Sequence, residues 1–288
     1  MKMRCTNSVV RAWGTFIFVA AMLSFIAGAN LKAQGNGAAV AATAKAAAPR
    51  DLTGYWVSIV TEDWRWRMTI PDKSDYVTIP INEEGRRAAD AWDPAKDKAA
   101  ADEQCKGYGA AVIMQVPGRF HITWQDDNTL KIDIDSGTQT RLLHFGGSAP
   151  PNMAPTWQGY SVAYWGDPSD PVDQRGGGGG PAGQRSPEHL EPANAPRTRG
   201  PLETYLRVVT THMRPGYLHK NGVPYSGNAM LQEFYTVSSY KNYTWLAVTT
   251  VVTDPQYLVE PYVTHAHYKK LADNSGWDPT PCKSDEVR

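Results

Sequence analysis

The chain has 288 residues, and its 29 Lys and Arg balance 29 Asp and Glu, so the net charge is zero. Charges of both signs dispersed along a neutral chain give no electrostatic attraction to a nucleic-acid backbone or to an anionic membrane surface. We therefore predict neither as a partner. The 10 Trp and 14 Tyr residues indicate a folded chain, because disordered chains are poor in aromatic residues.

Residues 1–29 have the pattern of a secretory signal peptide. Basic residues precede an apolar run at 12–26, and the small residues Ala27-Gly28-Ala29 follow it. The run is shorter than the roughly 20 apolar residues of a spanning helix, so we expect a cleaved signal that leaves no stable membrane anchor. This predicts a periplasmic or secreted protein. Residues 30–50 are rich in Ala and lack aromatic residues, which predicts a flexible leader.

Two cysteines remain once Cys5 leaves with the signal peptide. In an oxidising compartment, Cys105 and Cys282 are expected to form a disulfide, and neither has a neighbouring His or basic cluster that would indicate a reactive thiol. The loop that they would close spans most of the mature chain. In the chain-entropy model such a cross-link contributes about 4 to 5 kcal/mol.

The mature chain reads mainly as β-strands. Residues 56–70 alternate and predict one long twisted strand or a bent strand pair. The Ala-rich residues 82–104 predict a helix that is broken at Asp93-Pro94. Asn221-Gly222 predicts a tight hairpin. Further strands are predicted at 111–116, 119–124, 130–134, 138–145, 156–165, 203–212, 227–238, 244–253 and 261–270.

These elements predict a single domain at residues 51–282, followed by a short tail at 283–288. The Pro- and Gly-rich residues 167–201 have almost no apolar side chains and predict a disordered insertion. The short connections favour an all-β antiparallel meander that closes into a barrel or a strongly curled sheet, with one Ala-rich helix near the N-terminal third.

Two resemblances support this fold. Leu52-Thr53-Gly54-Tyr55-Trp56 places a GxW sequence at the head of the first strand and resembles the lipocalin (calycin) signature. This likeness implies an up-and-down barrel whose base is filled by Trp56. Residues 137–141, 156–162, 253–257 and 260–261 also resemble a broad group of uncharacterised exported bacterial proteins, which implies a fold and a compartment but no activity.

His212 is the first candidate for proton transfer. It continues the apolar face of Leu206 and Val208, and is therefore expected to face the barrel interior. With the nearby Arg214, Tyr217 and Tyr225, it would form a general acid/base set with a charge stabiliser. The alternative is a structural His beside an Arg that pairs with a surface acid.

Three further residues are candidates for the same chemistry. Glu233 is a buried carboxylate if it shares an inward face with Leu231 and Tyr235, and a solvated one if the other face is inward. Arg141 poses the same choice, and on the inward face it would meet Glu233 or a ligand carboxylate. His121 is the second candidate proton carrier.

His265 and His267 lie on one strand face, and a zinc site would need a third ligand such as His121 or His212. No cysteine or carboxylate lies at ligand spacing, so we predict no metal. The familiar nucleophile-elbow, phosphate-loop and zinc-protease motifs do not occur, so we predict no cofactor.

The aromatic residues favour a small-molecule binder. Aromatic walls with a few polar groups suit a small hydrophobic or aromatic ligand in the barrel, although such residues also fill ordinary cores. The alternatives are a cofactor-independent lyase, isomerase or hydratase, and an envelope interaction protein that uses the Pro/Gly segment. The predicted ligand-binding residues are Trp56, Trp64, Trp66, Trp157, Tyr160, Arg214, Tyr217, Tyr225 and His267, with Trp165 in the same wall as Trp157.

Overall fold

The computed structural model describes residues 42–166 and 205–287. They belong to one compact unit that begins at Ala42. The predicted signal peptide and the predicted insertion at 167–201 lie outside the described residues. No helix in the described part of the chain is long and apolar enough to cross a membrane.

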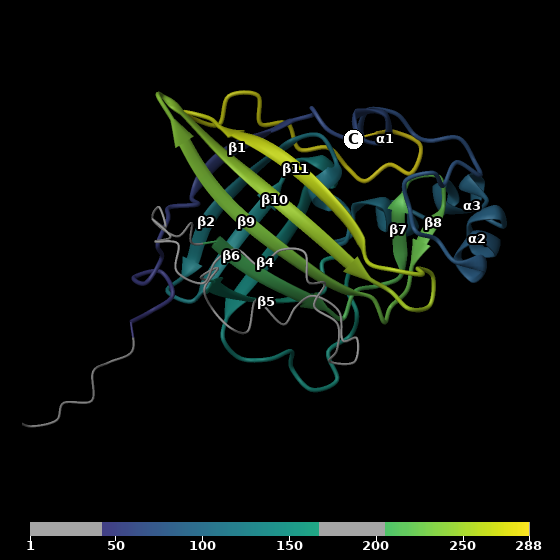
Figure 1. Cartoon of the computed structure of the whole chain (residues 1–288), viewed down its shortest axis with the longest axis horizontal. Coiled ribbons are helices and arrows are strands. Elements are labelled where there is room, and N and C mark those ends of the chain that lie inside the picture. Colours follow the sequence, from purple (N-terminus) through teal and green to yellow (C-terminus); the bar gives the residue numbers. More distant parts are fainter. Residues whose placement is uncertain (1–41, 167–204, 288) are drawn as a thin grey trace, which may run out of the picture. The chain divides into compact units, whose positions relative to one another are not determined.

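Nine strands of the described chain close into a barrel in the order β1-β11-β10-β9-β6-β5-β4-β3-β2 (Figure 1), which confirms the all-β barrel prediction. A separate hairpin joins β7 and β8. The strands are β1 Gly54–Ile59, β2 Arg119–Asp126, β3 Thr129–Ile134, β4 Gln139–Phe145, β5 Tyr160–Gly166, β6 Tyr205–Thr211, β7 Gly216–His219, β8 Val223–Tyr225, β9 Met230–Tyr240, β10 Tyr243–Thr253 and β11 Tyr262–Lys270.

The barrel differs from a pure antiparallel meander at one place. β4 and β5 are parallel, because residues 146–159 carry the chain back along the barrel before β5 begins. All the other neighbouring pairs in the barrel are antiparallel.

The barrel interior is filled by the inward-facing side chains that strand alternation predicts. In β10, Leu246 and Val248 are completely buried while their neighbours are partly exposed. Trp56 is also fully buried, and its indole Nε1 donates a hydrogen bond to the Leu52 carbonyl at 3.0 Å. Trp56 therefore fills the interior beside Phe120 instead of lining a hollow.

Residues 42–53 lie at the end of the barrel where β1 begins, which we call the leader end. The backbone NH of Lys45 donates to the Asp127 carbonyl at 3.0 Å, and that of Ala44 donates to Asn128 Oδ1 at 2.9 Å. The indole Nε1 of Trp165 in turn donates to the Ala44 carbonyl at 2.9 Å. The described part of the predicted leader is thus bound to the β2–β3 turn and to β5.

The opposite end, which we call the hairpin end, carries β7, β8 and the short helices (Figure 1). Asn82 caps α2 by accepting from the Gly85 NH at 2.8 Å, and Asp93 caps α3 with Pro94 at its first position. The predicted helix at 82–104 therefore forms as shorter pieces, with the expected break at Asp93-Pro94. The helices are α1 Trp64–Met68, α2 Glu83–Asp90, α3 Pro94–Ala99, and the 3₁₀ helices η1 Glu103–Tyr108, η2 Ile113–Gln115 and η3 Ser136–Thr138.

Two strand predictions are wrong. The predicted strand at 56–70 ends at Ile59 because Asp63 takes a left-handed φ of 50° and starts α1. Trp64 is consequently 63% exposed and shares no strand face with Trp56. Residues 111–116 form η2 instead of a strand, because a short buried apolar run has the same pattern in both structures.

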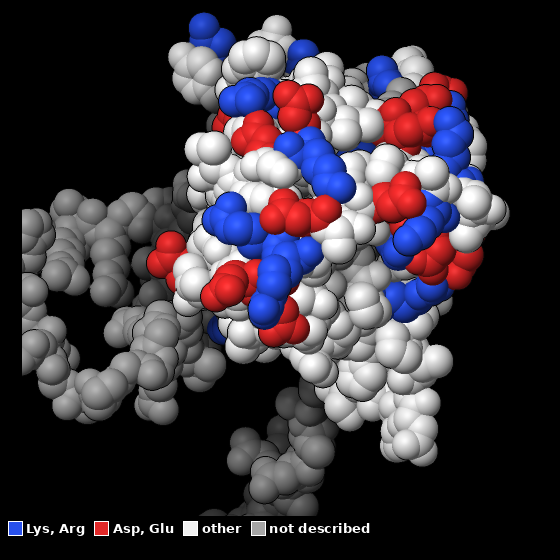
Figure 2. All heavy atoms as spheres, turned by 90° about the vertical axis from the view of Figure 1, so that its right-hand side faces the viewer, with Lys and Arg blue, Asp and Glu red and all other residues white. Residues whose placement is uncertain are grey.

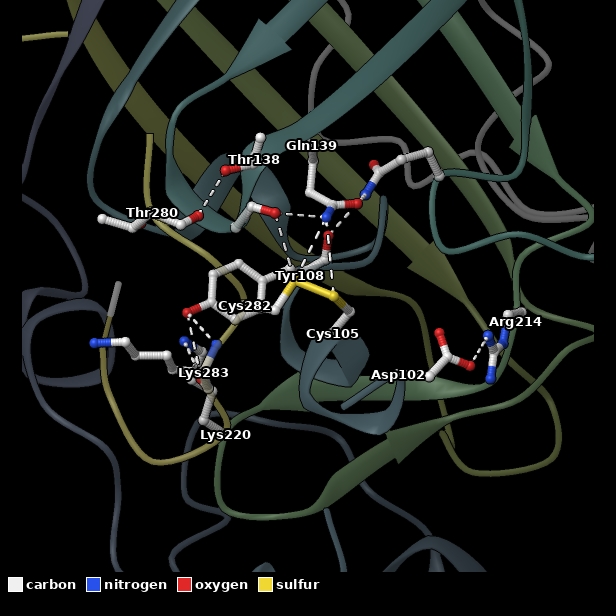
Figure 3. Close-up of a disulfide and its surroundings, with 12 residues drawn as sticks. Asp102, Cys105, Tyr108, Thr138, Gln139, Arg214, Lys220, Thr280, Cys282 and Lys283 are labelled. Atoms are coloured by element: carbon white, nitrogen blue, oxygen red, sulfur yellow. Dashed lines mark hydrogen bonds and ion pairs between the residues drawn. A yellow bond between two sulfur atoms is a disulfide. The ribbon is translucent and has the colours of Figure 1, made fainter. Parts of the chain in front are cut away.

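The predicted disulfide joins Cys105 in η1 to Cys282, with a Cα–Cα distance of 5.1 Å (Figure 3). Cys282 lies in the segment 271–287 after β11, which we call the C-terminal tail from here on. The same tail is held by Thr138, whose hydroxyl donates to the Thr280 carbonyl at 2.8 Å, and by the Asp135 carbonyl, which accepts from the Thr280 NH at 2.9 Å. The tail is therefore fixed both to η1 and to the β3–β4 connection.

We expect Cys282→Ser to lower the free energy of unfolding by about 3 to 5 kcal/mol, because the cross-linked residues are 177 apart and the unfolded chain regains the entropy of that loop. Urea unfolding of the variant and of reduced wild-type protein measures this loss. The two samples should agree, and an unchanged midpoint in both would contradict the prediction.

Candidate functional site

A recess of about 560 Å³ opens at the leader end. Its apolar walls are Leu52, Trp124, Leu130 and Trp165, and its polar groups come from the leader and the adjacent strand ends. Those polar residues are Lys45, Arg50, Asp51, Thr53 and Thr123.

Three aromatic side chains pack together beside this recess, and two of them, Trp124 and Trp165, line it. The rings of Trp124 and Phe145 are 5.5 Å apart between centroids, and those of Phe145 and Trp165 are 5.1 Å apart. All three are half-buried and pack against the barrel core. They come from the leader-end positions of β2, β4 and β5, and the bond from Trp165 to the Ala44 carbonyl fixes the orientation of its indole.

A second, more polar recess of about 460 Å³ adjoins the first and shares Arg50 and Asp51 with it. Burial raises the pKa of Asp51, but hydrogen bonds from Thr53 and the charge of Lys270 outweigh burial and lower the pKa overall. Asp51 is therefore a fixed negative charge between the two recesses.

The barrel interior holds a buried ion pair between Arg141 and Glu233. The two guanidinium nitrogens of Arg141 lie 2.8 and 2.5 Å from the two carboxylate oxygens of Glu233. Tyr235 donates to the same carboxylate at 3.1 Å, and Arg141 donates to Thr210 at 3.4 Å. The structure thus brings Arg141 and Glu233 together as the inward-facing interpretation expects, and both side chains are completely buried.

We expect Arg141→Met to destabilise the protein by about 3 to 5 kcal/mol, because it leaves the Glu233 carboxylate buried without its partner. Combining it with Glu233→Leu should recover most of this loss. The matched control is Lys131→Met, which removes a partly exposed pair with Asp133 and should cost less than about 1 kcal/mol. Urea unfolding of the three variants measures these differences, and equal losses for Arg141→Met and Lys131→Met would contradict the argument.

The two histidines predicted as proton carriers, His212 and His121, lie outside the barrel interior. His212 is exposed, and its Nδ1 lies 2.9 Å from the Thr211 hydroxyl. The prediction that it faces inward is wrong because His212 takes a φ of 57°, which ends the strand alternation of β6. His121 lies on the outer face, where its ring stacks on Tyr55 at 3.9 Å.

The residues expected around His212 have structural partners instead. Arg214 pairs with Asp102 at 2.7 Å (Figure 3) and with Glu103 at 3.2 Å, and its guanidinium lies 4.1 Å from the Trp157 ring centroid. This is the alternative of an Arg paired with surface acids. The Tyr217 hydroxyl donates to Asp97 at 2.8 Å, and Tyr225 is completely buried in the core of the hairpin end.

The remaining predicted ligand residues are dispersed over the surface. Tyr160 stacks on His144 at 4.7 Å on the outside of the barrel. His267 is exposed and lies 3.1 Å from Glu62. The structure therefore does not bring the predicted ligand residues together. Sequence reasoning missed Trp124, which lines the recess, and Phe145, which packs against Trp124 and Trp165, although each continues the inward face of its strand.

A buried histidine at the hairpin end was also missed. His219 ends β7, and its Nε2 lies 3.1 Å from the Tyr262 hydroxyl. Burial lowers the pKa of His219 to about 4, opposed by the charge of Asp75. The ring is therefore neutral at neutral pH.

This burial predicts a loss of stability in mild acid. Between pH 6.5 and about pH 4 the unfolded chain protonates His219 while the folded protein does not, so the free energy of unfolding should fall as the pH falls. The loss amounts to about 3 kcal/mol. Urea unfolding at several pH values gives the free energy of unfolding as a function of pH. Its decrease toward acid pH should be less steep for His219→Gln than for the wild type, and as steep as in the wild type for the exposed His265→Gln. Identical slopes for wild type and His219→Gln would contradict the prediction.

Comparison of the chain with protein families, curated proteins and solved structures found no match.

Proposed function

We propose that this is an exported protein that binds a small hydrophobic or aromatic molecule in the recess at the leader end of its barrel. The observation that carries the proposal is that Trp124 and Trp165, both half-buried, line an open recess of about 560 Å³, while Phe145 packs against both of them. Rings that pack on the core with one face retain the other for a ligand.

The dimensions and chemistry of the recess support this assignment. Small-molecule sites have volumes of roughly 300 to 1,000 Å³ and combine apolar walls with a few fixed polar groups. Here Asp51 is fixed by hydrogen bonds from the Thr53 NH at 2.9 Å and hydroxyl at 2.7 Å. The neighbouring Arg50 and Lys45 supply positive charge. These groups would orient a polar substituent on an otherwise apolar ligand.

Binding is favoured over catalysis by the composition of the recess. Its lining, among the described residues, contains no imidazole and one carboxylate, Asp51, whose pKa is lowered, so it offers neither a histidine nor a carboxyl group with a raised pKa for proton transfer. The ion pair of Arg141 and Glu233 is completely buried and cannot reach a ligand there.

The export part of the proposal rests on the signal-like N-terminal sequence together with the disulfide of Cys105 and Cys282. Disulfides persist in the periplasm and outside the cell, whereas cytosolic thiols are kept reduced. Fractionation of cells that express the full chain, followed by the mass of the mature protein, tests export and the cleavage near residue 29.

The binding proposal predicts saturable binding of a neutral aromatic probe such as N-phenyl-1-naphthylamine. Titration should raise the probe fluorescence and quench the tryptophan emission. Trp124→Leu and Trp165→Leu should each weaken binding by about tenfold or more, because each removes an aromatic wall of the recess.

The matched control is Trp64→Leu, because Trp64 is 63% exposed and lies outside the recess. It should bind the probe as the wild type does. Non-saturable binding, or an equal effect of Trp64→Leu and Trp165→Leu, would overturn the proposal.

A further inference from the structure

A separate small cavity lies at the hairpin end, between α1, the residues after η2, the end of β7 and the start of β11. Its volume is about 50 Å³, enough for roughly three or four water molecules or a small organic ion. The walls that matter for its chemistry are Trp66, Arg67, Pro117, His219 and Tyr262.

Arg67 brings an unused hydrogen-bond donor to this cavity. The residue is only 4% exposed, its Nε donates to the Gln115 carbonyl at 2.9 Å, and its Nη1 donates to Glu62 at 3.0 Å. Its Nη2 is buried and has no hydrogen-bond partner among the described residues. Leaving a buried guanidinium nitrogen unpaired is costly, so the position favours an acceptor in the cavity.

His219 brings a second unused hydrogen-bond donor to the cavity. Its ring stacks on Trp66, with a centroid separation of 5.6 Å and an interplanar angle of 16°, and is only 9% exposed. The Tyr262 hydroxyl lies 3.1 Å from His219 Nε2, and one of the two tautomers of the ring accepts the phenol proton there. The neutral ring then carries its hydrogen on Nδ1, and Nδ1 is buried with no partner in the described part of the chain.

The charges around the cavity favour an anion. Lys220 also borders it, but its ammonium donates to the carbonyls of Glu286 at 2.6 Å and Val287 at 3.1 Å and lies beneath the Tyr108 ring (Figure 3). Asp63 on the rim is exposed, so water screens its charge, and Glu62 pairs with only one of the two Nη atoms of the buried Arg67. On the outer face of this end, acidic and basic side chains are intermingled (Figure 2), so the buried groups set the preference.

We propose that this cavity binds a small monocarboxylate, whose oxygens accept hydrogen bonds from Arg67 Nη2 and His219 Nδ1. Two nitrogens suit the two oxygens of a carboxylate, whereas a phosphate would leave further oxygens unpaired. Ile70, Val112 and Leu218 supply apolar wall for a short hydrocarbon chain. This site is distinct from the leader-end recess and does not depend on the function proposed there.

Sodium propionate is the probe that tests the site. We expect saturable shifts of the Trp66 indole signal in ¹H–¹⁵N NMR spectra of the whole protein at constant ionic strength, with sodium chloride as the reference. His219→Phe keeps the stacked ring but removes the Nδ1 hydrogen, and Arg67→Gln removes the charged donor. Each should weaken propionate binding by about tenfold or more.

The matched control is Arg87→Gln, since Arg87 is an exposed arginine in the last turn of α2 and does not line the cavity. It should bind propionate like the wild type, as should Trp165→Leu. Because Arg67→Gln removes internal hydrogen bonds, the folded state of each variant is checked by circular dichroism, and His219→Phe alone decides if Arg67→Gln does not fold. Absence of saturation, unchanged binding in folded His219→Phe, or binding of sodium phosphate in place of propionate would overturn the proposal.

Discussion

The buried ion pair of Arg141 and Glu233 occupies the barrel interior and so restricts where a ligand could bind. Two charges are removed from water inside the strand layer, and only their bidentate geometry, with Tyr235 and Thr210 as further partners, offsets the cost of desolvation. The pair and the surrounding side chains fill the barrel toward the hairpin end. Space for ligands therefore remains at the two ends instead of along the axis.

The two ends differ in chemistry because different parts of the chain close them. At the leader end, a few residues before β1 cross beside the inward aromatic side chains of β2, β4 and β5, and the resulting recess is wide and largely apolar. At the hairpin end, α1, η2 and the β7–β8 hairpin pack over the strands, and the resulting cavity is small and lined by a buried Arg and His. The disulfide strengthens this second closure by joining η1 to the tail.

Much of the barrel could be predicted from the sequence because strand alternation is a local pattern. Alternation puts Arg141 on the face of Leu143 and Glu233 on the face of Tyr235 but leaves open which face is inward, whereas the cysteine count identifies the disulfide. The pattern fails where one backbone angle changes the direction of the chain. A left-handed residue ends alternation at Asp63 and at His212, so Trp64 and His212 point to solvent. The recess and the His219 cavity depend on which strand ends meet in space, which the alternation within one strand does not encode.

The parallel contact between β4 and β5 follows from simple counting. In a closed barrel of nine strands, the strand direction cannot alternate all the way round. Because the number of strands is odd, at least one neighbouring pair must be parallel. That seam is joined by only three residue pairs, from Leu143 with Ser161 to Phe145 with Ala163, whereas β9 and β10 share eleven. This short seam lies beside Trp165, so the place where the strand order of the barrel is least regular is also next to a wall of its aromatic recess.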